Sequence, residues 1–187
     1  TESTDRSLRE YKTVMKIVHC DWGSGEEKRA ICIASRQQDG WKVERIENAG
    51  DPLTLIRRMR SGMQRHERLV IGFDFVIGYP VAFGRRAQLN SFLDAIPDFG
   101  AGPWEDFFIK ARLQDEISIH RPFYPRSCRV RGEATQEMLT NALEIEWDQL
   151  FRECERETPY RRQASPLFWT LGPKQVGTAT MLGWQEV

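Results

Sequence analysis

Two aspartates stand at equivalent places in the sequence, each at the end of an apolar run. Asp21 closes the run 14–20, and Asp74 follows residues 70–73. If these runs are parallel neighbouring strands, their backbones lie about 4.8 Å apart and the two carboxylates could share one divalent ion. Mg²⁺ and Mn²⁺ prefer oxygen ligands, generate a bound hydroxide and clamp the oxygens of a phosphodiester. The pair therefore predicts a metal site in which Asp21 and Asp74 are both ligands and catalytic residues.

The same aspartates also suit a structural role. Asp21 could cap the turn at residues 22–25, and Asp74 could cap the loop that leads to Pro80, because Asp side chains often bond nearby backbone groups in turns. An ionised carboxylate beside an apolar strand is costly unless it is paired, hydrogen-bonded or bound to a metal. Both interpretations of the pair stay open from the residues alone.

The elements that must position the aspartates follow from hydrophobic patterning. Apolar or alternating runs at 14–20, 29–36 and 41–46, separated by short turns that include Asp39-Gly40, predict three strands in an antiparallel meander. Asp51 as N-cap and Pro52 as first helical residue predict a helix with Leu53, Ile56 and Met59 on its apolar side.

The run 69–77 alternates little, which predicts a central strand covered on both faces. A helical crossover would place this strand in the same sheet, parallel to the first. The fold class is therefore α/β, with a mixed sheet that carries the meander, the crossover helix and a fourth strand parallel to the first. No later run is a convincing core strand. Short helices at 88–97 and 104–111, an irregular arginine-rich stretch at 120–132 and one long helix at 135–157 predict a helical insert.

Three further segments could contact a substrate. Ser24 and Lys28 lie in a glycine-containing turn, Lys174 and Gln175 in a Gly/Thr-rich stretch that could bind phosphate, and Arg121 in a loop with Phe123 and Tyr124 interleaved. Each segment has a structural alternative: hairpin chemistry, a packing loop that begins a helix, and a rigid loop whose arginines pair with glutamates of the long helix. Glu116 is an additional carboxylate that could approach the metal from the insert.

Composition excludes several classes of protein. The 187 residues carry 27 basic and 27 acidic side chains, so the chain lacks the broad positive charge of a non-specific nucleic-acid coat. Forty per cent of the residues are hydrophobic, but no apolar run approaches the roughly 20 residues of a membrane span. The four cysteines form no Cys-x-x-Cys motif, which predicts reduced thiols and a cytoplasmic protein.

The strand order and several phrases of sequence resemble an uncharacterised bacterial family, a domain of unknown function regarded as RNase H-like nucleases. The phrases are His19-Cys20-Asp21-Trp22, Ile71-Gly72-Phe73-Asp74-Phe75, Ile77-Gly78-Tyr79-Pro80, Arg121-Pro122-Phe123-Tyr124-Pro125 and residues 171–177. The resemblance implies an RNase H-like fold and metal-dependent nuclease chemistry, with Asp21 and Asp74 at the first two acidic positions. Residues 21–28 also resemble, more weakly, the phosphate-binding hairpin of actin-like ATPases.

Members of the resembled family continue beyond the segment matching residues 183–184, with a strand and a helix that supply another acid. We therefore expect residues 1–187 to be a single RNase H-like domain that lacks its last strand, completed by a missing C-terminal segment or a second chain. The first functional hypothesis is a nuclease or other phosphodiester hydrolase that uses Mg²⁺ or Mn²⁺. The alternatives are a non-catalytic module that binds a protein or nucleic acid and, more weakly, an actin-like nucleotide-binding protein, because fold alone cannot choose among them.

Overall fold

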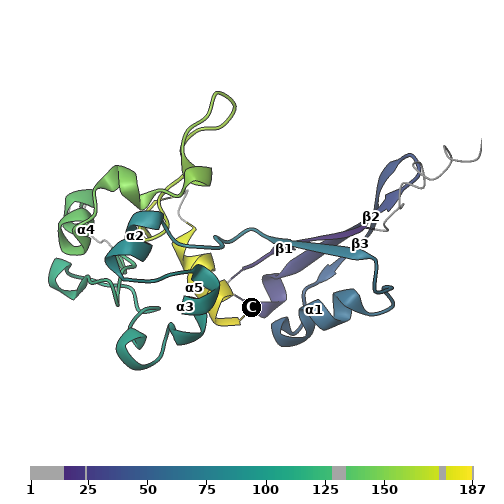
Figure 1. Ribbon diagram of the computed structural model, residues 1–187, viewed down its shortest axis with the longest axis horizontal. Helices are drawn as coiled ribbons and strands as arrows, with labels where there is room; N and C mark the ends of the chain where they lie inside the picture. Colours follow the sequence, from purple (N-terminus) through teal and green to yellow (C-terminus); the bar gives the residue numbers. More distant parts are fainter. Residues whose placement is uncertain (1–14, 24, 128–133, 173–175, 187) are drawn as a thin grey trace, which may run out of the picture. The chain divides into compact units, whose positions relative to one another are not determined.

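The computed structural model describes residues 15–23, 25–127, 134–172 and 176–186 (Figure 1). The chain divides into two compact units, one formed by Thr1–Asp74 with Glu186–Val187 and the other by Phe75–Gln185. The single domain expected over residues 1–187 stays a prediction. Across the described ranges, no helix is long and apolar enough to cross a membrane.

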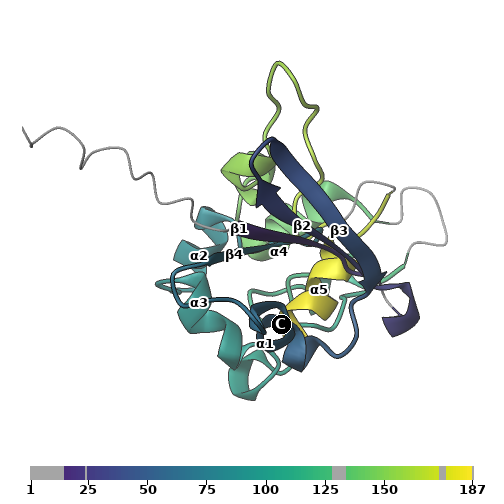
Figure 2. The same cartoon turned by 90° about the vertical axis from the view of Figure 1, so that its right-hand side faces the viewer.

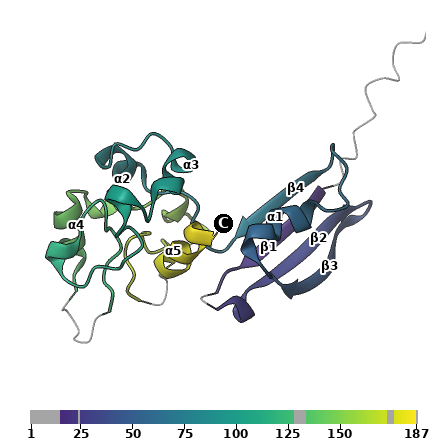
Figure 3. The same cartoon turned by 90° about the horizontal axis from the view of Figure 1, so that it is seen from below.

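The first unit is built on a four-stranded mixed sheet. Its elements are β1 (Met15–Asp21), a 3₁₀ turn (Glu26–Lys28), β2 (Ala30–Gln37), β3 (Gly40–Asn48), α1 (Pro52–Arg60) and β4 (Arg68–Phe73). The strand order is β3-β2-β1-β4, with β1 antiparallel to β2 and parallel to β4 (Figure 3). The predicted α/β class, antiparallel meander and crossover to a parallel fourth strand are confirmed.

The hairpin between β2 and β3 forms where the sequence predicts it (Figure 2). A turn at residues 38–39 brings Gln37 opposite Gly40, and Gly40 adopts a φ of 135°, a conformation that glycine reaches without steric cost. This turn fixes the pairing of β2 with β3, and a register shift between Ile33 and Ala34 bends the ladder further along.

The start of α1 agrees with the sequence, but its buried side does not. The Asp51 carboxylate accepts a hydrogen bond from the Leu53 amide at 3.0 Å, and Pro52 is the first helical residue. Leu55 and Met59 are buried, whereas Leu53 is 87% and Ile56 50% exposed. Residues four apart share one side of a helix, so α1 covers the sheet with Leu55 and Met59. The predicted apolar side is therefore wrong except at Met59.

The sheet buries one face and exposes the other. Val18 and Cys20 of β1 pair with Ile33 and Ile31 of β2, and all four side chains are fully buried. Lys16, also on β1, donates to the Met59 carbonyl of α1 at 3.3 Å. The opposite face leaves large apolar side chains 46–71% exposed; they are Trp41, Val43, Ile46 and Val70.

The prediction of a central, doubly covered fourth strand is wrong. Within the described residues, β4 is at the edge of the sheet, it ends at Phe73 rather than residue 77, and Val70 is 48% exposed. Continuous apolar character indicates a strand but does not show how many of its faces are covered. The residues after Phe73 leave the sheet, which places Asp74 directly at its edge.

The second unit contains short helices joined by turns. They are α2 (Val81–Arg86), α3 (Phe92–Ala95), α4 (Gln136–Leu143), α5 (Gly177–Glu186) and 3₁₀ turns at Ile96–Asp98, Gly102–Trp104, Gln114–Glu116, Trp147–Leu150 and Glu153–Glu155. Glu186, the last residue of α5, belongs to the first unit. No helix is predicted from the sequence at α2, and the helices predicted at 88–97 and 104–111 shorten to α3 and isolated turns.

The long helix predicted at 135–157 is wrong in length. It ends at Leu143 because Glu144 adopts the left-handed conformation, with a φ of 55°, and two 3₁₀ turns follow. Leu139, Leu143 and Leu150 are nevertheless buried, as their spacing predicts. Elsewhere in the second unit, Phe99 stacks on Phe107 with ring centroids 3.9 Å apart.

Candidate functional site

The two aspartates lie at the carboxyl ends of neighbouring parallel strands. The last register pair between β1 and β4 is Cys20 with Phe73, and the Asp74 amide donates to the Cys20 carbonyl at 3.0 Å. Asp21 and Asp74 therefore occupy the next position on their respective strands, and both are exposed. The predicted juxtaposition of the two carboxyl ends is confirmed by the strand pairing.

The two carboxylates differ in their surroundings. Asp74 Oδ1 accepts a hydrogen bond from the Trp22 backbone amide at 2.8 Å, which joins the end of β4 to the residue after Asp21. This bond fixes one Asp74 oxygen and leaves Oδ2 available. The Asp21 carboxylate has no hydrogen bond or ion pair within the part of the chain that the structure describes. The structural alternative predicts that Asp74 caps the loop to Pro80. Its carboxylate instead accepts a hydrogen bond from the Trp22 amide, so the expected capping bond is not the one formed.

A third carboxylate, missed by the sequence analysis, lies beside Trp22. Glu186 Oε2 accepts from the Trp22 indole Nε1 at 2.9 Å, and its Oε1 pairs with Arg29 Nη2 at 2.8 Å. The Arg29 guanidinium also lies 4.8 Å from the Trp22 ring centroid and donates from Nε to the Gly23 carbonyl at 3.2 Å. No motif or spacing in the sequence marks Glu186, because its partners are more than 150 residues away along the chain.

The pair of exposed aspartates suits Mg²⁺ better than a metal that needs a full set of protein ligands. Mg²⁺ keeps several waters and is usually bound by one or two carboxylates together with substrate phosphates. Asp21 contributes two uncommitted oxygens and Asp74 one, which fits that ligand set. Among the residues that the structure describes, no group of three His, Cys, Asp or Glu side chains could enclose a metal ion. Glu186 is already committed to Arg29 and Trp22.

Cys20 precedes Asp21 on β1, pairs with Phe73 of β4, and is fully buried. Burial, and to a smaller extent the charge of Asp74, raises the pKa of its thiol from 9.0 to about 11. The thiolate is the nucleophilic form of cysteine, so Cys20 is chemically inert at neutral pH and is a core residue.

We expect iodoacetamide at pH 8 to alkylate the exposed Cys154 of the native protein while leaving Cys20 unmodified, as measured by peptide mass spectrometry. Because the folded pKa is above the unfolded value, the unfolded chain ionises first, and the free energy of unfolding should fall between about pH 9 and 11. Cys20→Ala should remove this part of the pH dependence. Rapid alkylation of native Cys20 at pH 8 would contradict the prediction.

Of the other predicted substrate contacts, Lys28 and Arg121 lie in the described part of the chain, and neither side chain bonds to the aspartates there. Lys28 ends the 3₁₀ turn between β1 and β2 and is exposed, its backbone amide donating to the Gly25 carbonyl at 2.9 Å. Ser24, Lys174 and Gln175 lie outside the described residues. Gly177 begins α5, in agreement with the alternative in which the Gly/Thr-rich stretch leads into a helix.

Arg121 has a structural role within the second unit. Its guanidinium donates to the Ile109 and Lys110 carbonyls, both at 3.2 Å, and pairs with Glu116 at 3.4 Å. Phe123 and Tyr124 are at most 1% exposed, so the idea that these rings stack on bases is wrong. The rigid-loop alternative is the better description, although the recorded partner of Arg121 is Glu116 and not a glutamate of the predicted long helix.

Glu116 closes its own loop. Its carboxylate accepts from the Arg112 amide at 2.6 Å. This bond, together with the Leu113 amide and the charges of Arg121 and Arg112, lowers the pKa of Glu116 despite an opposing effect of burial. The carboxylate is thus satisfied within the second unit.

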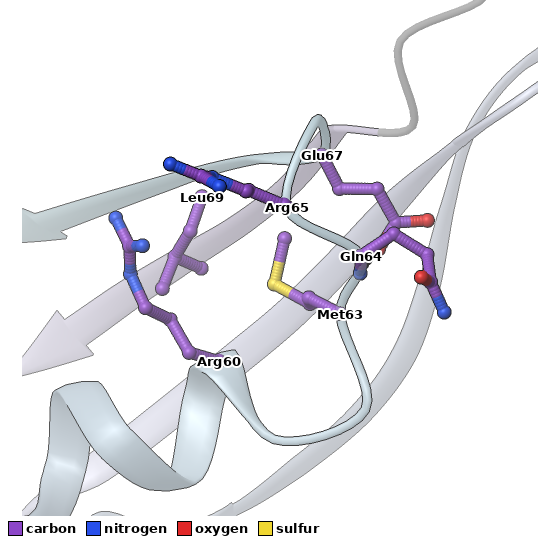
Figure 4. Close-up of a pocket in the computed structure, with 6 residues that line it drawn as sticks. All are labelled: Arg60, Met63, Gln64, Arg65, Glu67 and Leu69. Atoms are coloured by element: carbon purple, nitrogen blue, oxygen red, sulfur yellow. Dashed lines mark hydrogen bonds between the residues drawn. The ribbon is translucent and has the colours of Figure 1, made fainter.

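A small pocket lies at the other end of β4, between the end of α1 and the beginning of the strand (Figure 4). Its lining residues are Arg60, Met63, Gln64, Arg65, Glu67 and Leu69. β4 therefore has two chemically different ends: a basic pocket where the strand begins and a carboxylate pair where it ends. No family model matches the chain, and no curated protein or solved structure matches it either.

Proposed function

We propose that the chain is an RNase H-like phosphodiester hydrolase, a nuclease dependent on Mg²⁺ or Mn²⁺, with Asp21 and Asp74 as metal ligands. The observation that carries the proposal is the place of the two carboxylates, at adjacent positions on the carboxyl ends of parallel β1 and β4. Ligands of open α/β sheets gather at such ends. The strand order β3-β2-β1-β4, with its antiparallel meander, supports the RNase H-like assignment.

The contacts of each aspartate suggest a division of labour. The Trp22 amide holds Asp74 Oδ1, so the Asp74 carboxylate presents Oδ2 in a fixed direction. Asp21 is exposed and unrestrained, so it can adjust to the ion and the substrate. A metal bound here would supply the hydroxide and neutralise the phosphate in the displacement. A cation bound between the two carboxylates would also offset the repulsion between their like charges.

The test is thermal unfolding with increasing Mn²⁺ or Mg²⁺, on the wild type and on Asp21→Asn/Asp74→Asn. Ligand at 100 times its Kd stabilises a native protein by about 2.7 kcal/mol, so the wild-type melting temperature should rise with metal and that of the variant should not. Asp39→Asn/Asp106→Asn removes the same charge from two other exposed positions and is the matched control. An equal rise in the wild type and the Asp21/Asp74 variant would contradict the metal site.

A specific observation favours the second candidate, a non-catalytic RNase H-like module that binds a protein or nucleic acid. Asp74 bonds to the Trp22 amide and Glu186 to Arg29, so two of the three neighbouring acids serve the fold of the first unit. Metal-independent stability, together with binding of an oligonucleotide, would support this module. Stabilisation by ATP would instead support the actin-like nucleotide-binding alternative.

A further inference from the structure

The pocket at the beginning of β4 combines two arginines with an apolar floor. Arg60 ends α1, Arg65 follows in the loop, and Leu69 is in β4. Figure 4 shows the Arg60 and Arg65 side chains extending to the same side, with Leu69 between them and Met63 below. This arrangement presents two guanidinium groups to one ligand.

The charges of the two arginines are not neutralised within the described residues. Within the described residues, neither the Arg60 nor the Arg65 side chain forms a hydrogen bond or ion pair, and both residues are exposed. Glu67, the acidic residue in the lining, points the other way in Figure 4, where its Oε2 accepts from the Gln64 amide at 2.8 Å. By contrast, Arg58 on the same helix bonds the Ala49 and Asp51 carbonyls.

The size of the pocket limits the ligand. Its volume of about 120 Å³ corresponds to roughly four waters at about 30 Å³ each. Pockets for whole drug-sized ligands begin at about 300 Å³. The space therefore accepts a single phosphoryl group but not an entire nucleotide, and arginine forks match the geometry of phosphate oxygens.

We infer that Arg60 and Arg65 bind a backbone phosphate of a polynucleotide whose scissile bond lies at Asp21 and Asp74. The inference rests on the proposed function and adds to it a second substrate contact, a phosphate-binding site away from the two aspartates. β4 has 6 residues, so its two ends are about 20 Å apart. Phosphates of one strand are 3.4 Å apart along the axis of a duplex and further apart in an extended single strand, so the two ends are at most about six phosphates apart. Leu69 pairs with Lys16 on the face covered by α1, whereas Asp21 alternates to the opposite face. A polynucleotide that crosses the edge formed by β4 reaches both ends, and a mononucleotide does not.

The experiment measures binding of a fluorescent single-stranded 20-mer by Asp21→Asn/Asp74→Asn protein, without divalent metal, over a range of salt concentrations. Each phosphate contact on a single strand contributes about 0.7 to the slope of log K against log salt. Because both arginines contact one phosphate, adding Arg60→Ala/Arg65→Ala should reduce that slope by about 0.7 and weaken binding, and Arg60→Lys/Arg65→Lys should retain most of the slope. The control Arg36→Ala/Arg45→Ala removes two exposed arginines of the same unit and should leave the slope nearly unchanged.

Activity separates this inference from the proposed function. In otherwise wild-type protein, Arg60→Ala/Arg65→Ala should raise KM for the oligonucleotide but leave hydrolysis of bis-(p-nitrophenyl) phosphate unchanged. Arginine-dependent binding without any cleavage would refute the hydrolase but retain the phosphate pocket. Metal-dependent cleavage with an unchanged salt slope would refute the pocket alone. The pocket inference is also overturned if the protein binds no oligonucleotide. It is likewise overturned if Arg60 and Arg65 bind only inorganic phosphate or only anionic vesicles.

Discussion

Replacing Asp21 or Asp74 with Asn is expected to lower metal-dependent hydrolysis of an oligonucleotide by about 10²- to 10³-fold while the fold stays intact. Metal ions supply several kcal/mol of charge stabilisation in such transition states, and each 1.36 kcal/mol is a tenfold change in rate. Asn keeps the size of Asp and loses its charge. It also keeps an oxygen that can accept the Trp22 amide, so Asp74→Asn retains the bond that joins the ends of β1 and β4.

The stability of these variants makes the activity result interpretable. Removing one of two neighbouring like charges should leave the free energy of unfolding unchanged or raise it slightly in metal-free buffer, as measured by urea denaturation. Asp74→Ala is the informative comparison, because it also removes the acceptor for the Trp22 amide and should cost about 1 kcal/mol more than Asp74→Asn. Full hydrolytic activity in either Asn variant would rule out that residue as a metal ligand.

Local chemistry made much of the first unit predictable from sequence. The turn at residues 38–39, one residue before the predicted Asp39-Gly40, and the start of α1 at Asp51-Pro52 depend on backbone requirements of the residue types found there. The crossover from β3 to β4 follows from a general rule of connection. The placement of Asp21 and Asp74 then required only that the two apolar strands be parallel neighbours, and the register of β1 with β4 shows that they are.

The wrong predictions concern which side of each helix or strand is buried. Sequence patterns contain this information only indirectly. Leu53 and Ile56 are as apolar as Leu55 and Met59, but the sheet contacts the side of α1 that carries the latter pair. The helix predicted from residue 135 is too long because the observed helix ends before Glu144. Glu144 has a left-handed backbone conformation, which its residue type does not predict. Burial depends on the partner surface, and a single sequence does not contain that partner.

Contacts distant in sequence were the hardest part of the site to predict. From the sequence, Arg29 is only the first residue of the strand predicted at 29–36, and no motif marks Glu186. In the structure they form one buried cluster with Trp22, whose backbone amide also holds Asp74. The second large expected effect is a loss of folding stability when this ion pair is broken. The two charges are unequally buried, since the Arg29 side chain is 3% exposed and that of Glu186 is 28% exposed.

Glu186→Gln is expected to lower the free energy of unfolding by about 3 kcal/mol, the lower end of the range for breaking a buried ion pair because Glu186 is partly exposed. The change leaves the Arg29 charge buried, where Nη1 already has no hydrogen-bond partner within the described residues. Arg29→Met should cost much less. It keeps an apolar chain against Trp22, and the remaining Glu186 carboxylate can reach water.

Urea denaturation of Glu186→Gln, Arg29→Met and the double variant measures the coupling as a double-mutant cycle. The double variant should be more stable than Glu186→Gln alone, because it contains no uncompensated buried charge. Glu153→Gln breaks an exposed pair with Arg156 and should cost at most about 1 kcal/mol. Equal costs for Glu186→Gln and Glu153→Gln would contradict the buried-charge argument.

The same cycle distinguishes a structural Glu186 from a third metal ligand. If Arg29 neutralises Glu186, the double variant should regain stability and also retain the wild-type affinity for Mn²⁺, because Asp21 and Asp74 are unchanged. If Glu186 instead leaves Arg29 to bind the metal, the double variant should regain stability but lose metal affinity. The contacts of Glu186 with Arg29 and Trp22 favour the first result, since metal binding would have to leave a guanidinium buried without its counter-ion.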